Sequence, residues 1–411
     1  MRNKLNSIFK SKKENDPEIK DINIMSPNKE INHFKRAVNA GNPQRNDFNN
    51  NSNNNNINDN MNEDFRIFSG SNSDIINQYI NKSINKNVNE EKNINVCKDI
   101  NKDSNKNNNI FDTINANNSK VLKQYKNTKT LIGHEDQIVS LIQLSSGYIC
   151  TGSYDSSIKI WDITKDPKYA LVTTKYSKGF ILCLLELKSN ELLAGNSENC
   201  IDIFNIADKK SIEPDYHLFG HSLWVTALVK CDEEHFASAS NDAKIFIWDS
   251  NKKNKLKELL GHTDCIFTMI LLENGNLCSG SADQTIRIWD WKNGKYLSYL
   301  KAHSNWVKSI YQFNSQILLS GSDDRKIKIW NLKLDLLGKL EGHKHSIRTF
   351  FKIDDNYFAS GSFAHTIKIW DFYEKKCVSS LDGHTHNVIC IIKYDDKLIS
   401  CSSDKTIKIW E

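Results

Sequence analysis

The sequence predicts an all-β fold, a seven-bladed β-propeller preceded by a polar N-terminal region. The first observation is a repeated strand in which apolar residues alternate with polar ones and which closes on a Trp. It ends six times, at Trp161, Trp248, Trp289, Trp330, Trp370 and Trp410. The second observation is the spacing, because the first interval is 87 residues whereas the later ones are 41, 41, 40 and 40. Four strands in a period of about 40 to 45 residues are typical of a propeller array.

A degenerate unit is expected inside the long first interval. Residues 200–205 repeat the same alternation, with Phe204 in the place of Trp. Phe204 follows Trp161 by 43 residues and precedes Trp248 by 44, so it divides the interval almost evenly. The number of units is therefore seven, over about residues 121–411, a length that suits one domain with a large core.

Each unit is expected to form four strands, and the unit that begins at Gly261 shows why. An apolar run suits an inner strand with both faces buried, and Gly275 suits the turn after it because glycine adopts positive φ readily. The alternation of the third strand buries Ile286 and Ile288. The four strands are expected at residues 265–272, 277–281, 285–289 and 294–300.

These units resemble the repeats of WD40-repeat proteins over about residues 121–411. Most of them open on a Gly-His pair, and six end on Trp-Asp or a close variant. The opening pairs are Gly133-His134, Gly220-His221, Gly261-His262, Gly342-His343 and Gly383-His384, with Ala302-His303 as a near match. The resemblance implies that a His, a Ser or Thr, an Asp and a Trp form a hydrogen-bonded set in each blade, which we call the tetrad. The complete tetrads are expected to be His134, Thr151, Asp155 and Trp161; His221, Ser238, Asp242 and Trp248; His262, Ser279, Asp283 and Trp289; His303, Ser320, Asp324 and Trp330; and His384, Ser400, Asp404 and Trp410.

The tetrads are expected to be scaffold residues, because a buried imidazole and a buried indole N–H each need a partner. A catalytic interpretation of the repeated His, Asp and Ser is set aside, since catalysis needs one activated site rather than five copies. His-x-His occurs at residues 343/345 and 384/386, but the first member of each pair belongs to the scaffold and no third ligand stands nearby. The sequence also has no phosphate-binding loop or nucleophile elbow. It therefore predicts no enzyme, no cofactor and no metal site.

Two units depart from the pattern. In the second, Tyr176-Ser177 replaces Gly-His, Glu198 stands near the Asp place and Phe204 replaces Trp. In the sixth, Ala364 takes the place of Asp. These two blades are expected to be less rigid or to be held by apolar packing instead.

Members of the resembled family commonly complete each blade with the strand that precedes the next Gly-His pair. Residues 124–131 stand before Gly133-His134 and have no blade of their own to complete, whereas the unit that ends at Trp410-Glu411 lacks an outer strand. We therefore expect residues 124–131 to pair antiparallel with residues 405–410 and close the ring. This pairing would satisfy the backbone groups at the open seam.

The resemblance also indicates where a partner binds, because one rim of the central channel is formed by three kinds of position. These are the third and fifth residues after the His and the residue before the tight-turn Asp. They carry several large or charged side chains, which are Trp224, Trp306, Phe267, Lys308, Arg348, Tyr154 and Phe363. Trp306, Lys308 and Arg348 stand on adjacent units and suit a peptide with an acidic or phosphorylated side chain. The alternative is that the Trp rings pack against neighbouring blades and the cations are solvated.

Composition bounds the remaining possibilities. Residues 1–120 contain 35 Asn and few apolar residues, which predicts a largely disordered, low-complexity region. The sequence has no apolar run of about 20 residues and no secretory signal, so we expect an intracellular protein of the cytoplasm, the nucleus or both, without membrane contact. A formal net charge of +5 over 411 residues is small, and direct contact between the propeller and nucleic acid is not expected.

The leading hypothesis is a non-catalytic interaction scaffold that presents the channel rim to peptide segments of partner proteins in a multi-protein complex. The first alternative is a substrate receptor of a ubiquitin ligase that recognises an acidic or phosphorylated degron. The second alternative is an RNA-associated or ribosome assembly factor, against which the small net charge argues.

Overall fold

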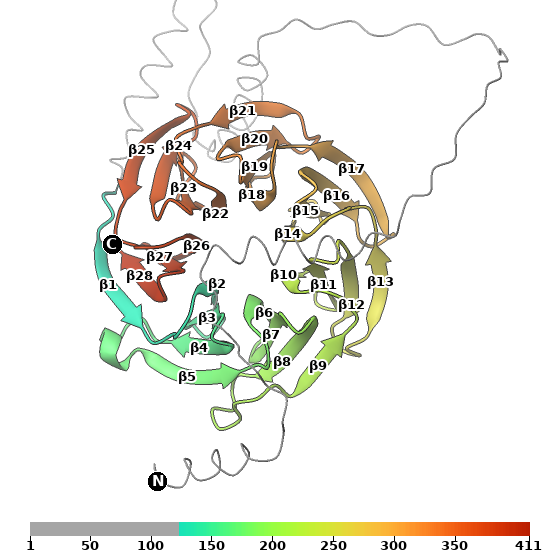
Figure 1. The fold of residues 1–411 in the computed structure, drawn as a ribbon, viewed down its shortest axis with the longest axis vertical. Helices are drawn as coiled ribbons and strands as arrows, with labels where there is room; N and C mark the ends of the chain where they lie inside the picture. Colours follow the sequence, from blue (N-terminus) through green and yellow to red (C-terminus); the bar gives the residue numbers. More distant parts are fainter. Residues whose placement is uncertain (1–122) are drawn as a thin grey trace, which may run out of the picture. The chain divides into compact units, whose positions relative to one another are not determined.

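The computed structural model describes residues 123–411, which form seven four-stranded antiparallel sheets. The sheets stand around a central axis as the blades of a propeller (Figure 1). The predicted fold is confirmed, and the degenerate unit forms blade 2. The disordered region predicted for residues 1–120 lies outside the described residues.

In each blade, chain order runs from the strand nearest the axis to the outermost strand, except that the outermost strand of blade 7 comes from the start of the described chain (Figure 1). Blade 1 contains β2 (Ile138–Gln143), β3 (Ile149–Ser153), β4 (Ser157–Trp161) and β5 (Leu171–Tyr176), with the short 3-10 helix η2 (Pro167–Tyr169) before β5. Blade 2 contains β6 (Ile181–Lys188), β7 (Glu191–Asn196), β8 (Cys200–Asn205) and β9 (Tyr216–Phe219). Blade 3 contains β10 (Val225–Lys230), β11 (His235–Ser240), β12 (Ile245–Asp249) and β13 (Lys255–Leu259).

The remaining blades follow the same order. Blade 4 contains β14 (Ile266–Leu271), β15 (Leu277–Ser281), β16 (Thr285–Asp290) and β17 (Lys295–Lys301). Blade 5 contains β18 (Val307–Asn314), β19 (Ile317–Ser322), β20 (Ile327–Asn331) and β21 (Leu336–Leu340). Blade 6 contains β22 (Ile347–Lys352), β23 (Tyr357–Ser362), β24 (Ile367–Asp371) and β25 (Lys376–Leu381). Blade 7 contains β26 (Val388–Tyr394), β27 (Lys397–Ser402), β28 (Thr406–Trp410) and β1 (Asn127–Ile132).

Strand β1 closes the ring by joining the two ends of the described chain. It pairs antiparallel with β28, from Asn127 opposite Trp410 to Ile132 opposite Thr406. Two further backbone hydrogen bonds, of 2.8 and 2.9 Å, join Lys126 and Glu411. The predicted closure is confirmed, although the strand begins at Asn127 rather than at residue 124.

The hydrophobic core lies between adjacent blades. At the seam, Leu131 of β1 belongs to the same buried cluster as Ile138 of blade 1 and Ile407 of blade 7. The second strand of blade 1 is buried along its whole length, and small residues permit this. A Cβ on Gly152 would lie 2.3 Å from the side chain of Ile181 in blade 2, so only glycine allows the two blades to pack this closely. No helix within residues 123–411 is long and apolar enough to span a bilayer.

Candidate functional site

The tetrad of blade 4 ties the loop before the inner strand to the middle of the sheet. His262 Nδ1 lies 2.7 Å from Asp283 Oδ2, and its Nε2 lies 2.8 Å from Ser279 Oγ. Trp289 Nε1 donates to the same Ser279 oxygen over 2.8 Å. Because the carboxylate accepts at Nδ1, the proton of the neutral imidazole is assigned to Nδ1, and the Ser hydroxyl donates to Nε2.

The charges in this tetrad follow from its burial. Burial lowers the pKa of His262, although the hydrogen bond that His262 donates to Asp283 opposes the shift. For Asp283, burial acts to raise the pKa, but the hydrogen bonds from His262 and Thr285 outweigh it and hold the pKa below its usual range. The pair therefore contains a neutral imidazole and an ionised carboxylate at neutral pH.

Four further blades, numbers 1, 3, 5 and 7, hold the same side chains in the same arrangement. In each, the three hydrogen bonds measure between 2.7 and 2.9 Å. In every case the first of the two hydroxyl residues that flank the small central residue takes part. The four sets are His134, Thr151, Asp155 and Trp161; His221, Ser238, Asp242 and Trp248; His303, Ser320, Asp324 and Trp330; and His384, Ser400, Asp404 and Trp410.

Blade 6 keeps three members of the tetrad and lacks the carboxylate. His343 Nε2 lies 2.6 Å from Ser360 Oγ, to which Trp370 Nε1 donates over 2.8 Å. Ala364 stands where the other blades have Asp, and Nδ1 of the buried His343 has no hydrogen-bond partner within residues 123–411. Burial, with a smaller contribution from Lys368, lowers the pKa of His343 to about 3.

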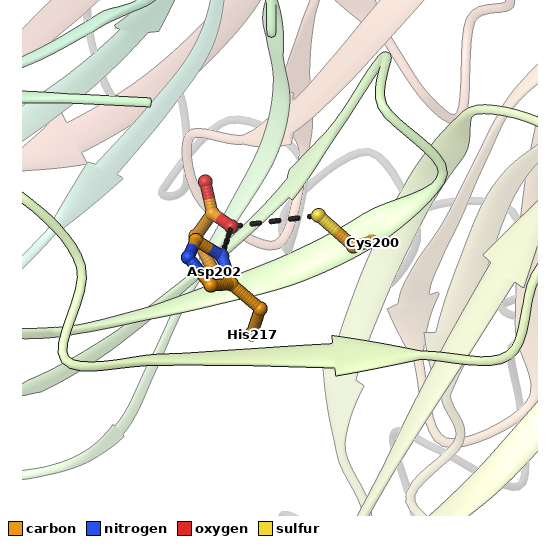
Figure 2. A group of neighbouring side chains, drawn as sticks. All are labelled: Cys200, Asp202 and His217. Atoms are coloured by element: carbon orange, nitrogen blue, oxygen red, sulfur yellow. Dashed lines mark hydrogen bonds and ion pairs between the residues drawn. The ribbon is translucent and has the colours of Figure 1, made fainter. Parts of the chain in front are cut away.

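Blade 2 has a polar network in place of a tetrad, which the expectation of a less rigid or apolar-packed blade did not include. Asp202 accepts hydrogen bonds from Ser177 Oγ over 2.5 Å and from His217 Nδ1 over 2.6 Å. Cys200 Sγ lies 3.5 Å from the same carboxylate (Figure 2). The sequence did not indicate this network, because Asp202 occupies a position where the other blades carry Lys, Arg or Phe. Phe204 is fully buried beside it.

The channel rim carries two groups of aromatic and basic side chains on one face. Trp224 and Trp306 each precede an inner strand, β10 and β18, and inner strands start at the same end of the propeller. The first group, which we call the Lys308 cluster, consists of Phe267, Trp306, Lys308, Arg348 and Phe363. The second, the Phe180 cluster, consists of Tyr154, Phe180 and Trp224.

In the Lys308 cluster, the ammonium group lies against two aromatic rings. Lys308 Nζ is 3.2 Å from the centroid of Phe267 and 4.3 Å from that of Trp306, and the two rings are 5.5 Å apart. Arg348 of blade 6 lies over the ring of Phe363, with Cζ 5.3 Å from the centroid. The alternative interpretation was that the Trp rings pack against neighbouring blades and that the cations are solvated. Its first part holds for Trp306, which packs against blade 4, but its second part fails for Lys308, which is only 8% exposed.

Burial is also the main influence on the charge of Lys308. Burial and, to a smaller extent, the nearby Arg348 lower the pKa of the ammonium, Asp323 and Asp264 act in the opposite direction, and the net pKa is about 7. Asp323 accepts a short hydrogen bond from Ser346 Oγ. Lys308 is therefore divided between its charged and neutral forms near neutral pH.

The Phe180 cluster extends the aromatic surface over blades 1 to 3. The rings of Tyr154 and Phe180 are stacked at 5.1 Å, and Phe180 meets Trp224 edge-on at 6.5 Å. Phe180 was missed by the sequence analysis, because blade 2 has no His from which to count. Ser177 stands in the His place of blade 2, and Phe180 is the third residue after it, which is one of the rim positions. Phe180 is 40% exposed.

The seven sheets and their tetrads define a β-propeller built from repeats that start with Gly-His and end with Trp-Asp. The chain contains WD40 repeats. The model of the WD domain, G-beta repeat, matches residues 125–162, 334–371 and 375–411. A model of the WDR41 β-propeller matches residues 186–341.

Similar curated proteins share only part of their length with this chain. The F-box/WD repeat-containing protein sel-10 of Caenorhabditis elegans is 26% identical over 120 residues, 29% of this chain and 20% of that protein. The F-box/WD repeat-containing protein 9 of Bos taurus is 26% identical over 142 residues, 34% of this chain and 29% of that protein. The DENN domain and WD repeat-containing protein SCD1 of Arabidopsis thaliana is 28% identical over 122 residues, 30% of this chain and 10% of that protein.

Among solved structures, the WD40 β-propeller domain of Doa1 has the same fold. It superposes with a TM-score of 0.63 at 20% sequence identity, covering 71% of this chain and 98% of that domain.

Proposed function

We propose that this protein is a non-catalytic interaction scaffold whose channel rim binds a peptide segment of a partner protein within a larger complex. The observation that carries the proposal is the Lys308 cluster. The ammonium of Lys308 faces two aromatic rings, at 3.2 and 4.3 Å from their centroids, and the residue is only 8% exposed. Binding of an oxyanion would stabilise this ammonium further, because a carboxylate or phosphate stabilises a cation more strongly than the face of an aromatic ring does.

The charges around Lys308 favour an acidic or phosphorylated side chain as the bound group. Arg348 lies close enough to depress the pKa of Lys308, so the two cations repel one another when no anion lies between them. An oxyanion at this place relieves the repulsion and can accept two hydrogen bonds from the Arg348 guanidinium. Asp323 offsets part of this positive charge and therefore reduces the preference for a doubly charged phosphate over a single carboxylate.

The Phe180 cluster supplies the apolar part of the same surface. Its rings are not required by the blade cores, and Phe180 is 40% exposed. Aromatic and Arg side chains are the residue types that dominate binding hot spots. A peptide that lies across the channel would place an apolar side chain on Phe180 and an acidic one near Lys308.

A second candidate function is a substrate receptor of a ubiquitin ligase. It is favoured by the two F-box/WD repeat-containing proteins among the similar curated proteins. In that case the acidic or phosphorylated peptide is a degron, and the rim chemistry is unchanged.

The test is affinity purification of partners by the full-length chain and by the variant Trp306→Ala/Lys308→Ala/Arg348→Ala. A matched control is Lys295→Ala/Tyr296→Ala, which removes an exposed cation and ring from the outer strand β17. We expect the rim variant to lose specific partners while its thermal unfolding stays cooperative, and the control to keep them. Retention of all specific partners by a folded rim variant rules out rim binding. Recovery of cullin or adaptor subunits favours the ligase receptor.

A further inference from the structure

Three side chains with metal-binding atoms meet in blade 2. Cys200 and Asp202 are two residues apart on β8 and so project from the same face of the strand. His217 lies directly opposite Asp202 on the neighbouring strand β9. The thiol sulfur, a carboxylate oxygen and an imidazole nitrogen all lie within 4.8 Å of one another. Figure 2 shows the three side chains turned toward one another.

The separations are close to those that a tetrahedral zinc ion requires. With bonds of about 2.3 Å to sulfur and 2.0–2.2 Å to oxygen and nitrogen, ligand atoms stand roughly 3.5 Å (S to O) and 3.3 Å (N to O) apart. Cys200 Sγ and Asp202 Oδ1 are already 3.5 Å apart. His217 Nδ1 and Asp202 Oδ1 are 2.6 Å apart, so they must separate by about 0.7 Å.

The surroundings allow that adjustment and hold the other two ligands still. The side chain of His217 is 35% exposed on the outermost strand of the blade, so its ring is free to rotate. Asp202 is buried, and Ser177 Oγ donates to its second oxygen over 2.5 Å. Asn196 Oδ1 accepts hydrogen bonds from the backbone N–H groups of Glu198 and Cys200, which fixes the start of β8, so a water molecule would fill the fourth position around a metal ion.

We propose that Cys200, Asp202 and His217 form a zinc-binding site that replaces the missing tetrad of blade 2. The tetrads tie the loop before the inner strand to the sheet, and blade 2 lacks the His, Ser and Trp that do so. A metal ion would link β8 to β9 directly, and Ser177 would connect the loop before β6 through Asp202. A thiolate and an imidazole favour zinc over the hard cations Mg²⁺ and Ca²⁺.

The competing interpretation is a hydrogen-bonded network without metal, in which His217 Nδ1 donates to the Asp202 carboxylate. The two interpretations differ in whether the sulfur contributes a bond. A Cys200→Ser substitution preserves a hydrogen-bond donor but weakens a zinc site strongly.

The test is titration of the chelator-stripped full-length protein with Zn²⁺ and with Co²⁺. We expect one zinc ion per chain, a higher Tm with zinc, and a near-ultraviolet thiolate charge-transfer band with cobalt. Cys200→Ser should abolish the band. Both Cys200→Ser and His217→Gln should weaken zinc affinity by more than roughly 10- to 100-fold, which is the loss typical when a residue that only hydrogen-bonds to a metal ligand is replaced. His365→Gln/His386→Gln, which removes two neighbouring exposed histidines, is the matched control and should bind like the parent chain.

Absence of stoichiometric zinc in the parent chain overturns the proposal, as does a cobalt spectrum that Cys200→Ser leaves unchanged. If Cys200→Ser fails to fold, His217→Gln decides, because its partly exposed side chain can be replaced without opening the core. Equal zinc affinity of His217→Gln and the parent chain then excludes the site.

Discussion

The ammonium of Lys308 in blade 5 lies 3.2 Å from the centroid of the Phe267 ring in blade 4. This contact joins two adjacent blades at the channel rim and keeps the cation from bulk water. It also makes the charge of Lys308 depend on pH in the range where proteins work, because its pKa is lowered to about 7.

Binding of an acidic peptide to the rim should weaken as pH rises above 7. A bound oxyanion raises the pKa of Lys308, so binding takes up a proton, and affinity falls by up to about tenfold per pH unit until the bound-state pKa is reached. Affinity for a phosphopeptide, measured by calorimetry at several pH values between about 7 and 9, checks this. In the control variant Lys308→Met, which keeps an apolar stem of similar length, the slope should vanish. A slope that is the same in both chains contradicts the prediction.

The lowered pKa of Lys308 also makes folding stability depend on pH, and stability rises with pH whereas peptide affinity falls. The folded-state pKa of Lys308 lies below its unfolded value of 10.5, so the unfolded chain binds more protons between these values. The cost of burying the charge is complete below about pH 7 and disappears as pH rises toward 10.5. Lys308→Met should therefore raise Tm at neutral pH and have less effect in alkaline buffer.

Truncation of Leu131 should destabilise the propeller by about 2–5 kcal/mol. Leu131 lies on the closing strand β1 and is 1% exposed within the core that joins blades 7 and 1. Its neighbour Ile132 is 75% exposed, so Ile132→Ala should cost less than about 1 kcal/mol. Chemical denaturation of Leu131→Ala and Ile132→Ala measures the difference. Equal stability of the two variants would mean that β1 does not close the ring in solution.

The substitution Ala364→Asp should stabilise blade 6 by about 1–2 kcal/mol. The new carboxylate would accept the hydrogen bond that His343 Nδ1 lacks within residues 123–411. The gain should be visible as a higher Tm at neutral pH. The reverse change in blade 1, Asp155→Ala, recreates the arrangement of blade 6 and should lower Tm.

The pH profile provides a second readout for blade 6. His343 has a folded-state pKa of about 3, below the unfolded 6.5, so its contribution to stability is present above pH 6.5 and is lost as pH falls toward 3. A carboxylate beside His343 raises the pKa of its imidazole, so the Ala364→Asp variant should lose less stability than the parent chain as pH falls from 6.5 toward 3. If acid sensitivity is unchanged, the new side chain does not contact His343.

Two fully buried serines should respond differently to replacement by alanine. Ser279 Oγ bonds to both His262 and Trp289, so Ser279→Ala leaves two buried groups unsatisfied and should cost about 2–4 kcal/mol. Ser250 Oγ has no hydrogen-bond partner within the described residues, and Ser250→Ala should change stability by less than about 0.5 kcal/mol. Thermal unfolding of both variants checks the contrast, and similar losses would argue against a stabilising role for the tetrad.

The number of blades, the order of strands and the closing partner of β28 were all predictable from the sequence. These features depend on spacing and alternation, which are local properties that recur every 40 residues or so. The side chains of the tetrads were implied by the resemblance to WD40 repeats, and they could be placed because a residue that recurs at one place in each repeat occupies one place in each blade.

Tertiary structure alone decided how side chains from different blades meet. The sequence left open whether Lys308 belongs to a binding patch or is solvated, and only the packing of blade 5 against Phe267 of blade 4 shows that it is buried. Cys200, Asp202 and His217 have no spacing that indicates a ligand set, and they come together because β8 pairs with β9 in one register. The physical reason is that a repeat fixes the backbone of each blade, whereas a contact between strands depends on register and on which face each side chain takes.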